Sequence, residues 1–348
     1  MAEGTPETIV YVSNAGSTEV YVLAMNRASG DLDLVEKVPV PGGGQPSPAS
    51  MPMALSPDRR FLHVALRSEP FTAASFRIDP ASGRLTHLGN APLDAPMAYT
   101  TTDRTGRWLI SASYPHGKLV INAIDGGGRV TAPPSQIITD RPKAHCVIVD
   151  AANKNVYCPV LAQDIVMQLK FDPASGTVVP NSPAEIRSTP GAGPRHLAFH
   201  PSGRFLYLIT ETTATVGAYA VDPANGTLNE LQFVDMLAAD YTGKRAAADL
   251  HVTPNGNFLY GSERRTSTLA GFRIDPEKGT LSPIGRTPTE TTPRGFAIDP
   301  RGRFLLSAGL DSNHLTVYRI DPGSGALDPL KRYAMGKQPN WIEFADLK

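Results

Sequence analysis

The amino-acid sequence predicts an all-β chain folded as a seven-bladed β-propeller with four antiparallel strands in each blade. Three observations support this prediction. A unit of roughly 50 residues repeats along the chain, each unit divides into four short apolar runs, and the two ends of the chain supply complementary parts of one unit. Units of this length with four strands are typical of propeller blades.

The repeat is clearest in two segments that match in order and phase, GPRHLAFHPSGRFLYL (193–208) and TPRGFAIDPRGRFLLS (292–307). We aligned the copies on the residue that precedes the first turn of each unit. The steps between these residues are 46, 47, 51, 53 and 46 residues. The aligned residues are Pro57, Asp103, Asp150, Pro201, Pro254 and Pro300.

The first two runs of each unit are rich in β-branched and aromatic residues, which favour strands. The first run occurs seven times, at 50–56, 95–101, 144–150, 193–200, 247–253, 292–299 and 338–345. The second run also occurs seven times, at 9–16, 61–68, 108–115, 155–162, 205–212, 258–265 and 304–311. The seventh copy of the first run, at 338–345, lies near the C-terminus. The second run at 9–16 has no copy of the first run before it in the sequence. We therefore predict that the two termini share one blade and close the ring.

The third and fourth runs meet at a recurring Asp-Pro turn that contains a glycine. It is written IDPASGRL (78–85), FDPASGTV (171–178), VDPANGTL (221–228), IDPEKGTL (274–281) and IDPGSGAL (320–327). Asp, Pro and a Gly able to adopt a positive φ are the residues that tight turns require. We expect these residues to be structural and not catalytic.

The composition indicates one domain over residues 1–348, because a single repeat runs through the chain without a linker. The 33 Lys and Arg residues balance 33 Asp and Glu residues, and no basic cluster alternates with aromatics, so we expect no nucleic-acid partner. No apolar run is long enough to span a membrane and no signal peptide is evident, so we expect a cytoplasmic monomer or homodimer. Cys146 and Cys158 fall inside strand runs and are expected to be reduced core residues.

The chain contains no phosphate-binding loop, dinucleotide fingerprint, Gly-x-Ser-x-Gly elbow or His-Glu-x-x-His motif. We therefore expect no cofactor and no metal. An enzyme with this sequence would use ordinary side chains.

Candidate site residues follow from the phase of the repeat, since the innermost strands of a propeller run parallel and begin at one mouth of the channel. In our alignment the slot of Arg195 holds Met51, Met97, Ala144, Ala248, Arg294 and Asn340 in the other blades. The next slot holds Pro52, Ala98, His145, His196, Asp249, Gly295 and Trp341. The second strands end at the same mouth with Arg67, Tyr114, Glu211 and Arg264.

This set of histidine, arginine and carboxylate side chains suits a reaction in which negative charge develops on a carbonyl oxygen. Fixed guanidinium groups such as those of Arg195 and Arg294 would stabilise that oxyanion and hold an anionic lactone substrate. His145 has an intrinsic pKa suited to a general base, and partial burial would raise the pKa of Glu211 toward neutrality. We therefore expect either residue to activate water.

The chain resembles, over nearly its full length, the bacterial cytosolic 6-phosphogluconolactonases of the seven-bladed propeller type, which are related to fungal carboxymuconate lactonizing enzymes. The matching segments are GAGPRHLAFHP (191–201), AADLHVTPNG (247–256), PTETTPRGF (288–296), HLTVYRI (314–320) and RYAMGKQPNW (332–341). The resemblance implies metal-free hydrolysis of 6-phosphogluconolactone to 6-phosphogluconate in the pentose phosphate route. It also implies that the active-site group is His145, Arg195, Glu211 and Arg294.

Two residues depart from the pattern of that family. Ala162 replaces a lysine before Gln-Asp, which removes a possible phosphate contact, and Ala246 replaces a tryptophan, which would widen the pocket. The segment 41–52 is longer than in those enzymes and is expected to form a mobile loop beside the mouth. A different lactone is therefore an open alternative.

Further residues are candidates for substrate binding, with structural roles as the alternative for several of them. The candidates are Arg67, His196, Asp249, Arg264, Asn340 and Trp341. For His196 and His251 a structural role is favoured, because they fall where neighbouring blades place packing or turn-bonding residues, whereas Asp249 equally suits bracing its blade and binding a ligand. Two alternative functions are a lactonase or cycloisomerase for a non-phosphorylated lactone or a muconate-type acid, and a non-enzymatic binding scaffold. The scaffold is disfavoured because the Gly-His and Trp-Asp signatures of common scaffold propellers are missing.

Overall fold

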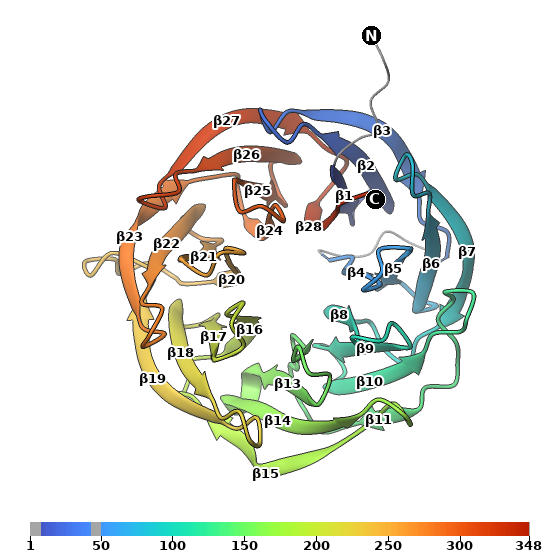
Figure 1. Ribbon diagram of the computed structural model, residues 1–348, viewed down its shortest axis with the longest axis horizontal. Helices are drawn as coiled ribbons and strands as arrows, with labels where there is room; N and C mark the ends of the chain where they lie inside the picture. Colours follow the sequence, from blue (N-terminus) through green and yellow to red (C-terminus); the bar gives the residue numbers. More distant parts are fainter. Residues whose placement is uncertain (1–7, 43–49, 348) are drawn as a thin grey trace.

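The computed structural model of the chain describes residues 8–42 and 50–347. Within these ranges the chain forms seven four-stranded antiparallel sheets arranged radially in a ring (Figure 1). A single short 3-10 helix, η1 (Leu161–Gln163), interrupts the strands of the described part. The predicted fold class is confirmed.

The first four blades in chain order are numbered 1 to 4, and each is given from its innermost strand outward. Blade 1 contains β28 (Pro339–Ala345), β1 (Thr8–Asn14), β2 (Glu19–Met25) and β3 (Leu32–Pro39). Blade 2 contains β4 (Met53–Leu55), β5 (Phe61–Leu66), β6 (Thr72–Ile78) and β7 (Leu85–Pro92). Blade 3 contains β8 (Tyr99–Thr102), β9 (Trp108–Ser113), β10 (Lys118–Ala123) and β11 (Gln136–Ile138). Blade 4 contains β12 (Ile148–Val149), β13 (Asn155–Val160), β14 (Ile165–Asp172) and β15 (Thr177–Arg187).

The last three blades follow the same order. Blade 5 contains β16 (Pro194–Phe199), β17 (Phe205–Thr210), β18 (Thr215–Val221) and β19 (Leu228–Asp235). Blade 6 contains β20 (Ala247–Val252), β21 (Phe258–Glu263), β22 (Thr268–Ile274) and β23 (Leu281–Pro288). Blade 7 contains β24 (Pro293–Ile298), β25 (Phe304–Gly309), β26 (His314–Ile320) and β27 (Leu327–Ala334).

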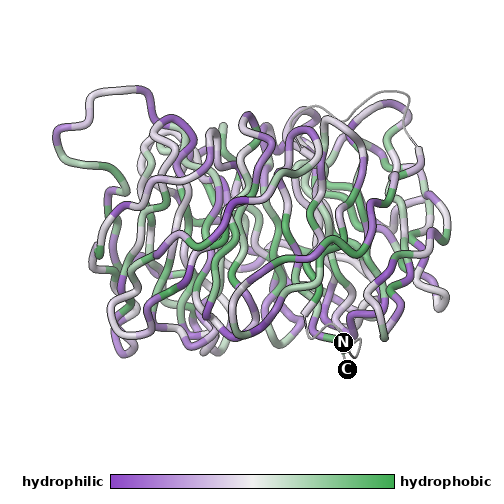
Figure 2. Tube along the Cα trace, turned by 90° about the horizontal axis from the view of Figure 1, so that it is seen from above, coloured by the Kyte–Doolittle hydropathy of each residue, from purple (hydrophilic) through white to green (hydrophobic). Residues whose placement is uncertain are grey.

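The two ends of the chain close the ring, as predicted. Strand β28 pairs antiparallel with β1, from Ile9 opposite Ala345 to Ser13 opposite Trp341. The innermost strand of blade 1 therefore comes from the C-terminal end of the sequence. Figure 2 shows the ring from the side, with hydrophobic segments in its interior and hydrophilic residues in the loops at both faces.

The second strands form the buried layer of each blade. All residues of β5, β13, β17, β21 and β25 are buried. Both faces of these strands contact neighbouring blades, which explains why their sequences are continuously apolar. Cys146 and Cys158 are free and buried, as expected. Burial raises the pKa of the Cys158 thiol to about 12, so this residue stays in its neutral form.

The Asp-Pro turn is structural, as predicted, and it also links adjacent blades. In its first copy, the Asp79 carboxylate accepts hydrogen bonds from the backbone N–H groups of Ala81 and Ser82 at 3.0 and 2.8 Å. Gly83 has a φ of 72°, and a Cβ atom there would lie 2.4 Å from Ile9, so only glycine fits. The Tyr11 hydroxyl, in the preceding blade, donates to the Gly83 carbonyl at 2.8 Å. The same link recurs as Tyr157 to Gly226, Tyr207 to Gly279 and Tyr260 to Gly325.

The predicted alignment of blades 3 and 4 is wrong by one residue. Asp103 and Asp150 each accept hydrogen bonds from the two backbone N–H groups that begin the second strand. In blade 7 this role belongs to Asp299 and not to Pro300, with which we had aligned them. Because side chains alternate along a strand, this shift changes which residues face the channel.

The corrected alignment changes the members of both slots at the mouth. The slot of Arg195 holds Met51, Ala98, His145, Ala248, Arg294 and Asn340 in the other blades. The next slot holds Pro52, Tyr99, Cys146, His196, Asp249, Gly295 and Trp341. His145 therefore shares a slot with the two arginines and not with His196.

Candidate active site

The site arginines lie at β-bulges where the first strands begin. Pro194 pairs with Thr210 and His196 pairs with Ile209, so Arg195 is an extra residue without an opposite partner. Arg294 and Asn340 occupy the same bulge position in blades 7 and 1. A bulge rotates the strand locally, so that consecutive side chains can point to the same side. It is this irregularity that places both Arg195 and His196 on the channel.

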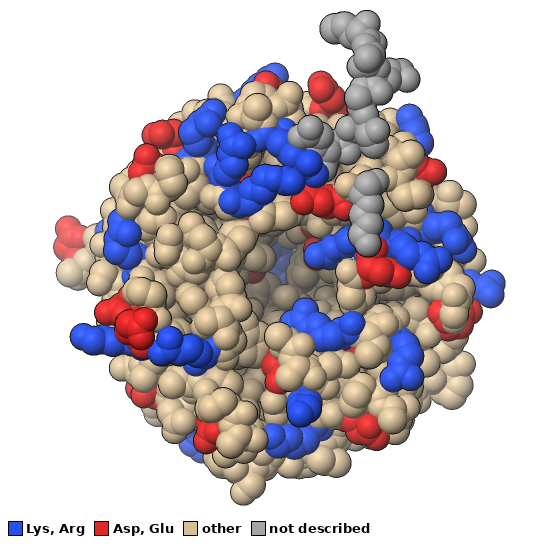
Figure 3. Space-filling model, viewed as in Figure 1, with Lys and Arg blue, Asp and Glu red and all other residues tan. Residues whose placement is uncertain are grey.

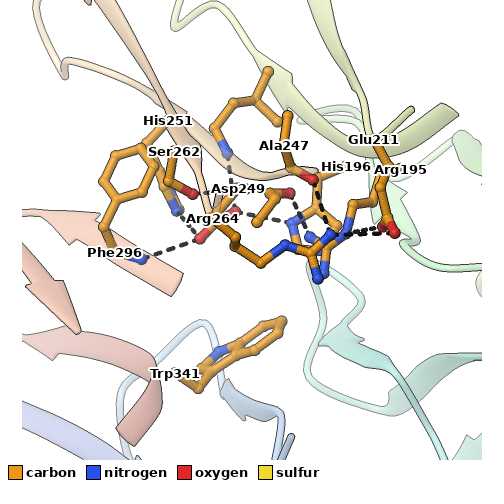
Figure 4. Close-up of polar contacts among 12 residues, drawn as sticks. Arg195, His196, Glu211, Ala247, Asp249, His251, Ser262, Arg264, Phe296 and Trp341 are labelled. Carbon is orange, nitrogen blue, oxygen red and sulfur yellow. Dashed lines mark hydrogen bonds and ion pairs between the residues drawn. The ribbon is translucent and has the colours of Figure 1, made fainter. Parts of the chain in front are cut away.

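Arg195, Glu211 and Arg264 form a connected ion-pair network at the mouth (Figure 4). The Nε atom of Arg195 donates to Glu211 Oε2 at 2.8 Å, and Arg264 NH2 lies 3.2 Å from Glu211 Oε1. Arg195 NH1 donates to the Ala248 carbonyl and lies 3.2 Å from His196 Nε2. The Arg195 side chain is 1% exposed, so these contacts are largely shielded from water.

The arginine side chains differ in how many N–H groups they leave for a ligand. The contacts of Arg195 occupy Nε and NH1, which leaves the NH2 group among its five donors. Arg294 forms no hydrogen bond or ion pair with any residue in 8–42 or 50–347. Burial and the neighbouring guanidinium groups, first that of Arg195, lower the pKa of Arg294 well below its usual value. A bound anion would relieve this unfavourable environment.

His145 lies beside these arginines in a buried position. Its ring centroid is 5.0 Å from that of His196 and 5.5 Å from that of Tyr114. Its Nδ1 atom is buried and has no hydrogen-bond partner among the described residues. Burial, and then the charge of Arg195, lower the pKa of His145 well below 6.5. The ring is therefore neutral at neutral pH, and it carries an unengaged nitrogen.

The expectation that burial would raise the pKa of Glu211 toward neutrality is wrong. Burial does act in that direction, but the guanidinium groups of Arg195 and Arg264 outweigh it and hold the pKa of Glu211 below its usual value. Both carboxylate oxygens are already engaged with these cations. Glu211 therefore orients the arginines and is a poor acceptor for a proton.

A second series of polar contacts runs from Arg195 through His196 in blade 5 to Asp249 and His251 in blade 6. His196 Nδ1 lies 2.8 Å from Asp249 Oδ1, and His251 Nε2 lies 3.1 Å from Asp249 Oδ2. Burial, and then the Arg195 charge, lower the pKa of His196 to about 4, so its neutral ring donates through Nδ1 and accepts from Arg195 through Nε2. Burial opposes ionisation of Asp249, yet the two histidines hold the pKa of this carboxyl far below its usual value.

The contacts of Asp249 favour the bracing role, which was one of its two expected roles. Besides the two histidines, its carboxylate accepts hydrogen bonds from the backbone N–H groups of Leu250 at 3.0 Å and Phe296 at 3.3 Å. The Phe296 contact connects blade 6 to blade 7. With four partners, this carboxylate has little capacity left to bind a substrate.

Trp341 lines the cavity beside His145 and Arg195, and Tyr99 packs against Trp341 and His196. The Trp341 ring centroid lies 4.9 Å from that of Tyr99 and 6.4 Å from that of His196. The position of Trp341 in the cavity lining is compatible with the pocket role that was one of its two possible roles. Tyr99 was missed by the sequence analysis, and an alignment on the aspartates Asp103 and Asp299 would have found it.

Asn340 is held by the protein backbone. Its Oδ1 atom accepts from Met51 N at 3.1 Å, and its Nδ2 atom donates to the Gln338 carbonyl at 2.9 Å. Asn340 also lines the cavity beside His145 and Arg195. Its contacts indicate that it joins blades 1 and 2 at the mouth.

The remaining expected residues lie around the rim. Arg67 is half-buried, and its charge acts on Arg294, as does that of Arg264. The backbone of Ala246 is part of the mouth, because its carbonyl accepts from Arg264 Nε at 2.9 Å. Residues 43–49 of the predicted loop at 41–52 lie outside the described residues.

Ala162 lies in η1 and is exposed. The backbone N–H group of the preceding residue, Leu161, donates to the Lys143 carbonyl at 3.2 Å. The Lys143 ammonium lies 5.9 Å from the Tyr114 ring centroid, next to His145. An exposed cation is therefore present close to the position where the expected lysine is missing, and the sequence analysis did not single it out.

Comparisons with known proteins show the family of this chain. The family described as "Lactonase, 7-bladed beta-propeller" matches residues 5–344. The chain belongs to this lactonase family. The lactonase is 40% identical over 337 residues to a 6-phosphogluconolactonase of Pectobacterium atrosepticum, covering 97% of this chain and 98% of that protein. It is 39% identical over 333 residues to a 6-phosphogluconolactonase of Yersinia pestis, covering 96% of each chain.

Solved structures support the same family. A periplasmic gluconolactonase of Pseudomonas aeruginosa superposes on the lactonase with a TM-score of 0.88 at 28% identity, covering 98% of this chain and 99% of that one. A putative 6-phosphogluconolactonase of Bacteroides fragilis gives a TM-score of 0.88 at 25% identity, covering 99% and 100%. The lactonase is thus an enzyme that hydrolyses lactones, which decides against the scaffold alternative. In the described ranges, no helix has the length and apolar character needed to cross a membrane.

Proposed function

We propose that the lactonase hydrolyses 6-phosphogluconolactone to 6-phosphogluconate with His145 as the general base. The observation that carries this proposal is the unengaged guanidinium of Arg294 beside the unengaged nitrogen of His145. Both line one cavity together with Arg195. The names of the relatives at 39 and 40% identity support the phosphorylated substrate.

The proposed reaction begins with a water molecule in the cavity lined by His145, Arg195 and Arg294. The cavity has a volume of about 10 Å³, which is about the space that one water molecule requires. His145 takes a proton from this water molecule while the water oxygen bonds to the carbonyl carbon of the lactone. The carbonyl oxygen becomes an oxyanion. It accepts hydrogen bonds from the Arg294 guanidinium and from the Nη2 atom of Arg195, which has no other contact among those given above.

The tetrahedral intermediate then collapses. The carbonyl double bond re-forms, the ring C–O bond breaks, and the leaving alkoxide takes the proton from His145. The product is an open hydroxy acid and the base is restored. Because His145 is neutral over the whole neutral range, it is ready to accept a proton without prior deprotonation.

Glu211, His196 and Asp249 have positioning roles in this proposal. Glu211 holds the guanidinium groups of Arg195 and Arg264 on either side of its carboxylate. Asp249 selects the His196 tautomer whose free Nε2 accepts from Arg195. A guanidinium held from both sides needs no reorganisation when the oxyanion forms.

A non-phosphorylated sugar lactone is the second candidate substrate. Two observations favour it, the alanine at position 162 and the similarity to a protein named a gluconolactonase. Lys143 favours the phosphorylated substrate, because its ammonium is exposed beside the mouth and has no ion pair with a described residue. A phosphorylated substrate would also require a cytoplasmic enzyme, since sugar phosphates do not cross membranes, so this location is part of the proposal.

The test is a lactone panel assayed by acid release at low temperature, which limits spontaneous ring opening. We expect the purified enzyme to open 6-phosphogluconolactone with a higher kcat/KM than gluconolactone. Arg294→Met should abolish most turnover of both lactones. The matched control is Arg265→Met, which changes the exposed arginine next to Arg264 and should leave turnover unchanged. A higher kcat/KM for gluconolactone would show that the preferred substrate is not phosphorylated. Full activity of Arg294→Met would show that the candidate active site is not the place of the reaction.

A further inference from the structure

The channel has a second cavity on the side of the ring opposite the candidate active site. Its volume is about 300 Å³, at the lower end of the range of small-molecule sites. Asp249, Asn340 and Trp341 line both cavities, so they form the wall between them. Figure 3 views the ring from this side and shows a hollow at its centre with Lys and Arg side chains nearby.

Arg59 reaches this cavity from a backbone position that favours glycine. Its φ is 60°, in the left-handed region that L-residues rarely adopt. It lies in the turn between the first and second strands of blade 2. The same position of the turn holds Asn153 in blade 4 and a glycine with a φ of 68 to 76° in the four other blades, namely Gly106, Gly203, Gly256 and Gly302. Arg59 and Asn153 are thus the two residues other than glycine among these six turns, and Arg59 is the less suited of the two, because asparagine adopts this conformation more readily than arginine.

The guanidinium of Arg59 has no partner that would explain this conformation. It forms no hydrogen bond or ion pair with any residue of the described ranges. By contrast, NH1 of the next residue, Arg60, lies 3.8 Å from Asp58 Oδ2. A residue held in an unfavourable backbone conformation, with its side chain facing a cavity, points to a functional role for that side chain. Its five N–H donors suit a carboxylate, which can accept two of them in parallel.

Glu343 supplies the complementary acceptor in the same cavity. Its Oε1 atom accepts a hydrogen bond from Trp341 Nε1 at 2.9 Å, and its Oε2 atom has no partner among the described residues. Tyr99 and Trp341 add aromatic surface to the wall. Such surface packs against the C–H groups of a sugar-like chain while a carboxylate accepts from its hydroxyl groups.

The charges in this cavity favour a ligand with a single negative charge. His251 Nε2 lies 3.1 Å from Asp249 Oδ2, and Asp249 holds the pKa of His251 above its usual value against the effect of burial, which favours the charged ring beside this carboxylate. Arg59 and Glu343 add one side chain of each charge to the lining of the cavity, without an ion pair between them. A dianion such as phosphate would be repelled by the two carboxylates, whereas a monocarboxylate would bind Arg59 with less repulsion.

We propose that this cavity is a second binding site, for a small hydroxycarboxylate whose carboxylate binds Arg59 and whose hydroxyl group donates to Glu343. The site lies apart from His145 and Arg294. It does not depend on which lactone is hydrolysed at the other mouth.

The experiment is calorimetric titration with gluconate, a stable hydroxycarboxylate. We expect Arg59→Gly to weaken binding at this site by roughly 10- to 100-fold, because a charge-assisted bidentate contact is lost. The matched control Arg60→Ala should bind gluconate within about twofold of the wild type. Arg294→Met should retain the Arg59-dependent binding, which separates this site from the active site.

The backbone position makes Arg59→Gly a well-behaved variant. Glycine removes the steric cost of the left-handed conformation and adds freedom to the unfolded chain, so we expect Tm to stay within about 2 °C of the wild type. Glu343→Gln retains the contact to Trp341 and should weaken gluconate binding by a smaller factor.

Three results would overturn this proposal. If Arg59→Gly bound gluconate as tightly as the wild type, Arg59 would not be part of a gluconate site. Loss of all gluconate binding in Arg294→Met would leave the active site as the only site. Tighter binding of inorganic phosphate than of gluconate, in the Arg294→Met background, would contradict the ligand class. None of these measurements requires turnover, so they stand apart from the test of the proposed reaction.

Discussion

At the scale of single residues, the Arg294 guanidinium differs from the groups around it, which already have hydrogen-bond or ion-pair partners. Arg195 and Arg264 are held by Glu211, and the tautomer of His196 is selected by Asp249. Arg294 has no such partner among the described residues. This contrast is the reason for assigning the oxyanion contact chiefly to Arg294.

Arg294→Met should lower kcat/KM for the preferred lactone by roughly 100- to 1,000-fold, the usual cost of removing one oxyanion donor. Methionine keeps much of the side-chain length and removes the charge, so the fold should be retained. Steady-state kinetics with circular dichroism of each variant would check this. A loss smaller than about fivefold would contradict the role of Arg294.

The pH dependence of kcat/KM should have its acid limb well below pH 6.5, because burial and the arginines lower the pKa of His145. Arg264→Met removes one of these positive charges. The pKa of His145 should then rise, and the acid limb should move to higher pH. A pH–rate profile of wild type and variant would measure the displacement, and an unchanged limb would argue against His145 as the base.

Lys143→Ala should raise KM for 6-phosphogluconolactone by about tenfold, because one charge-assisted contact to phosphate is worth roughly 1.5–3 kcal/mol when shielded and less at an exposed site. KM for gluconolactone should stay unchanged, since that substrate has no phosphate. An equal change for both lactones would mean that Lys143 does not contact the phosphate.

At the scale of strands and turns, the blades are joined by a recurring hydrogen bond. A tyrosine in the second strand of one blade donates to the carbonyl of the turn glycine in the next blade. The turn motif was recognised from sequence, because Asp, Pro and Gly specify its backbone locally. Its contact with the neighbouring tyrosine was not, because the two residues lie 65 to 72 positions apart.

Tyr207→Phe should lower the free energy of unfolding by about 1 kcal/mol, since a buried carbonyl loses its donor. Tyr219→Phe is the matched control, because the buried Tyr219 hydroxyl has no partner among the described residues. It should have no destabilising effect or a slight stabilising one. Urea unfolding followed by fluorescence would measure both, and equal losses for the two variants would contradict the proposed contribution of the link.

At the scale of the whole molecule, the ring depends on strand β28, which pairs with β1 and carries Asn340 and Trp341. The repeat of first and second runs, with one unpartnered copy near each end of the chain, predicted this closure correctly. Closure removes two sheet edges that would otherwise expose unpaired backbone groups.

Deletion of residues 339–348 should abolish cooperative unfolding, because β1 would become an exposed edge and the buried layer of blade 1 would lose its cover. A circular permutant with the natural ends joined by a flexible linker, and new ends at Gly126–Gly127, should retain a single transition. Neither requires activity as a readout, because calorimetry measures the transition directly. A cooperative, stable deletion variant would show that ring closure contributes little.

The sequence by itself determined the repeat, the number of blades, the closure by the termini and the group of residues at the mouth. These features depend on patterns that can be read along the chain, namely the recurring order of short apolar runs and the chemistry of the turns between them. Tertiary structure alone decided the low pKa of Glu211, and it corrected the register in blades 3 and 4, which the alignment on Asp103 and Asp150 had shifted by one residue. Those depend on which residues lie opposite one another across blades, and a one-residue difference in a turn or an added guanidinium nearby is enough to change them.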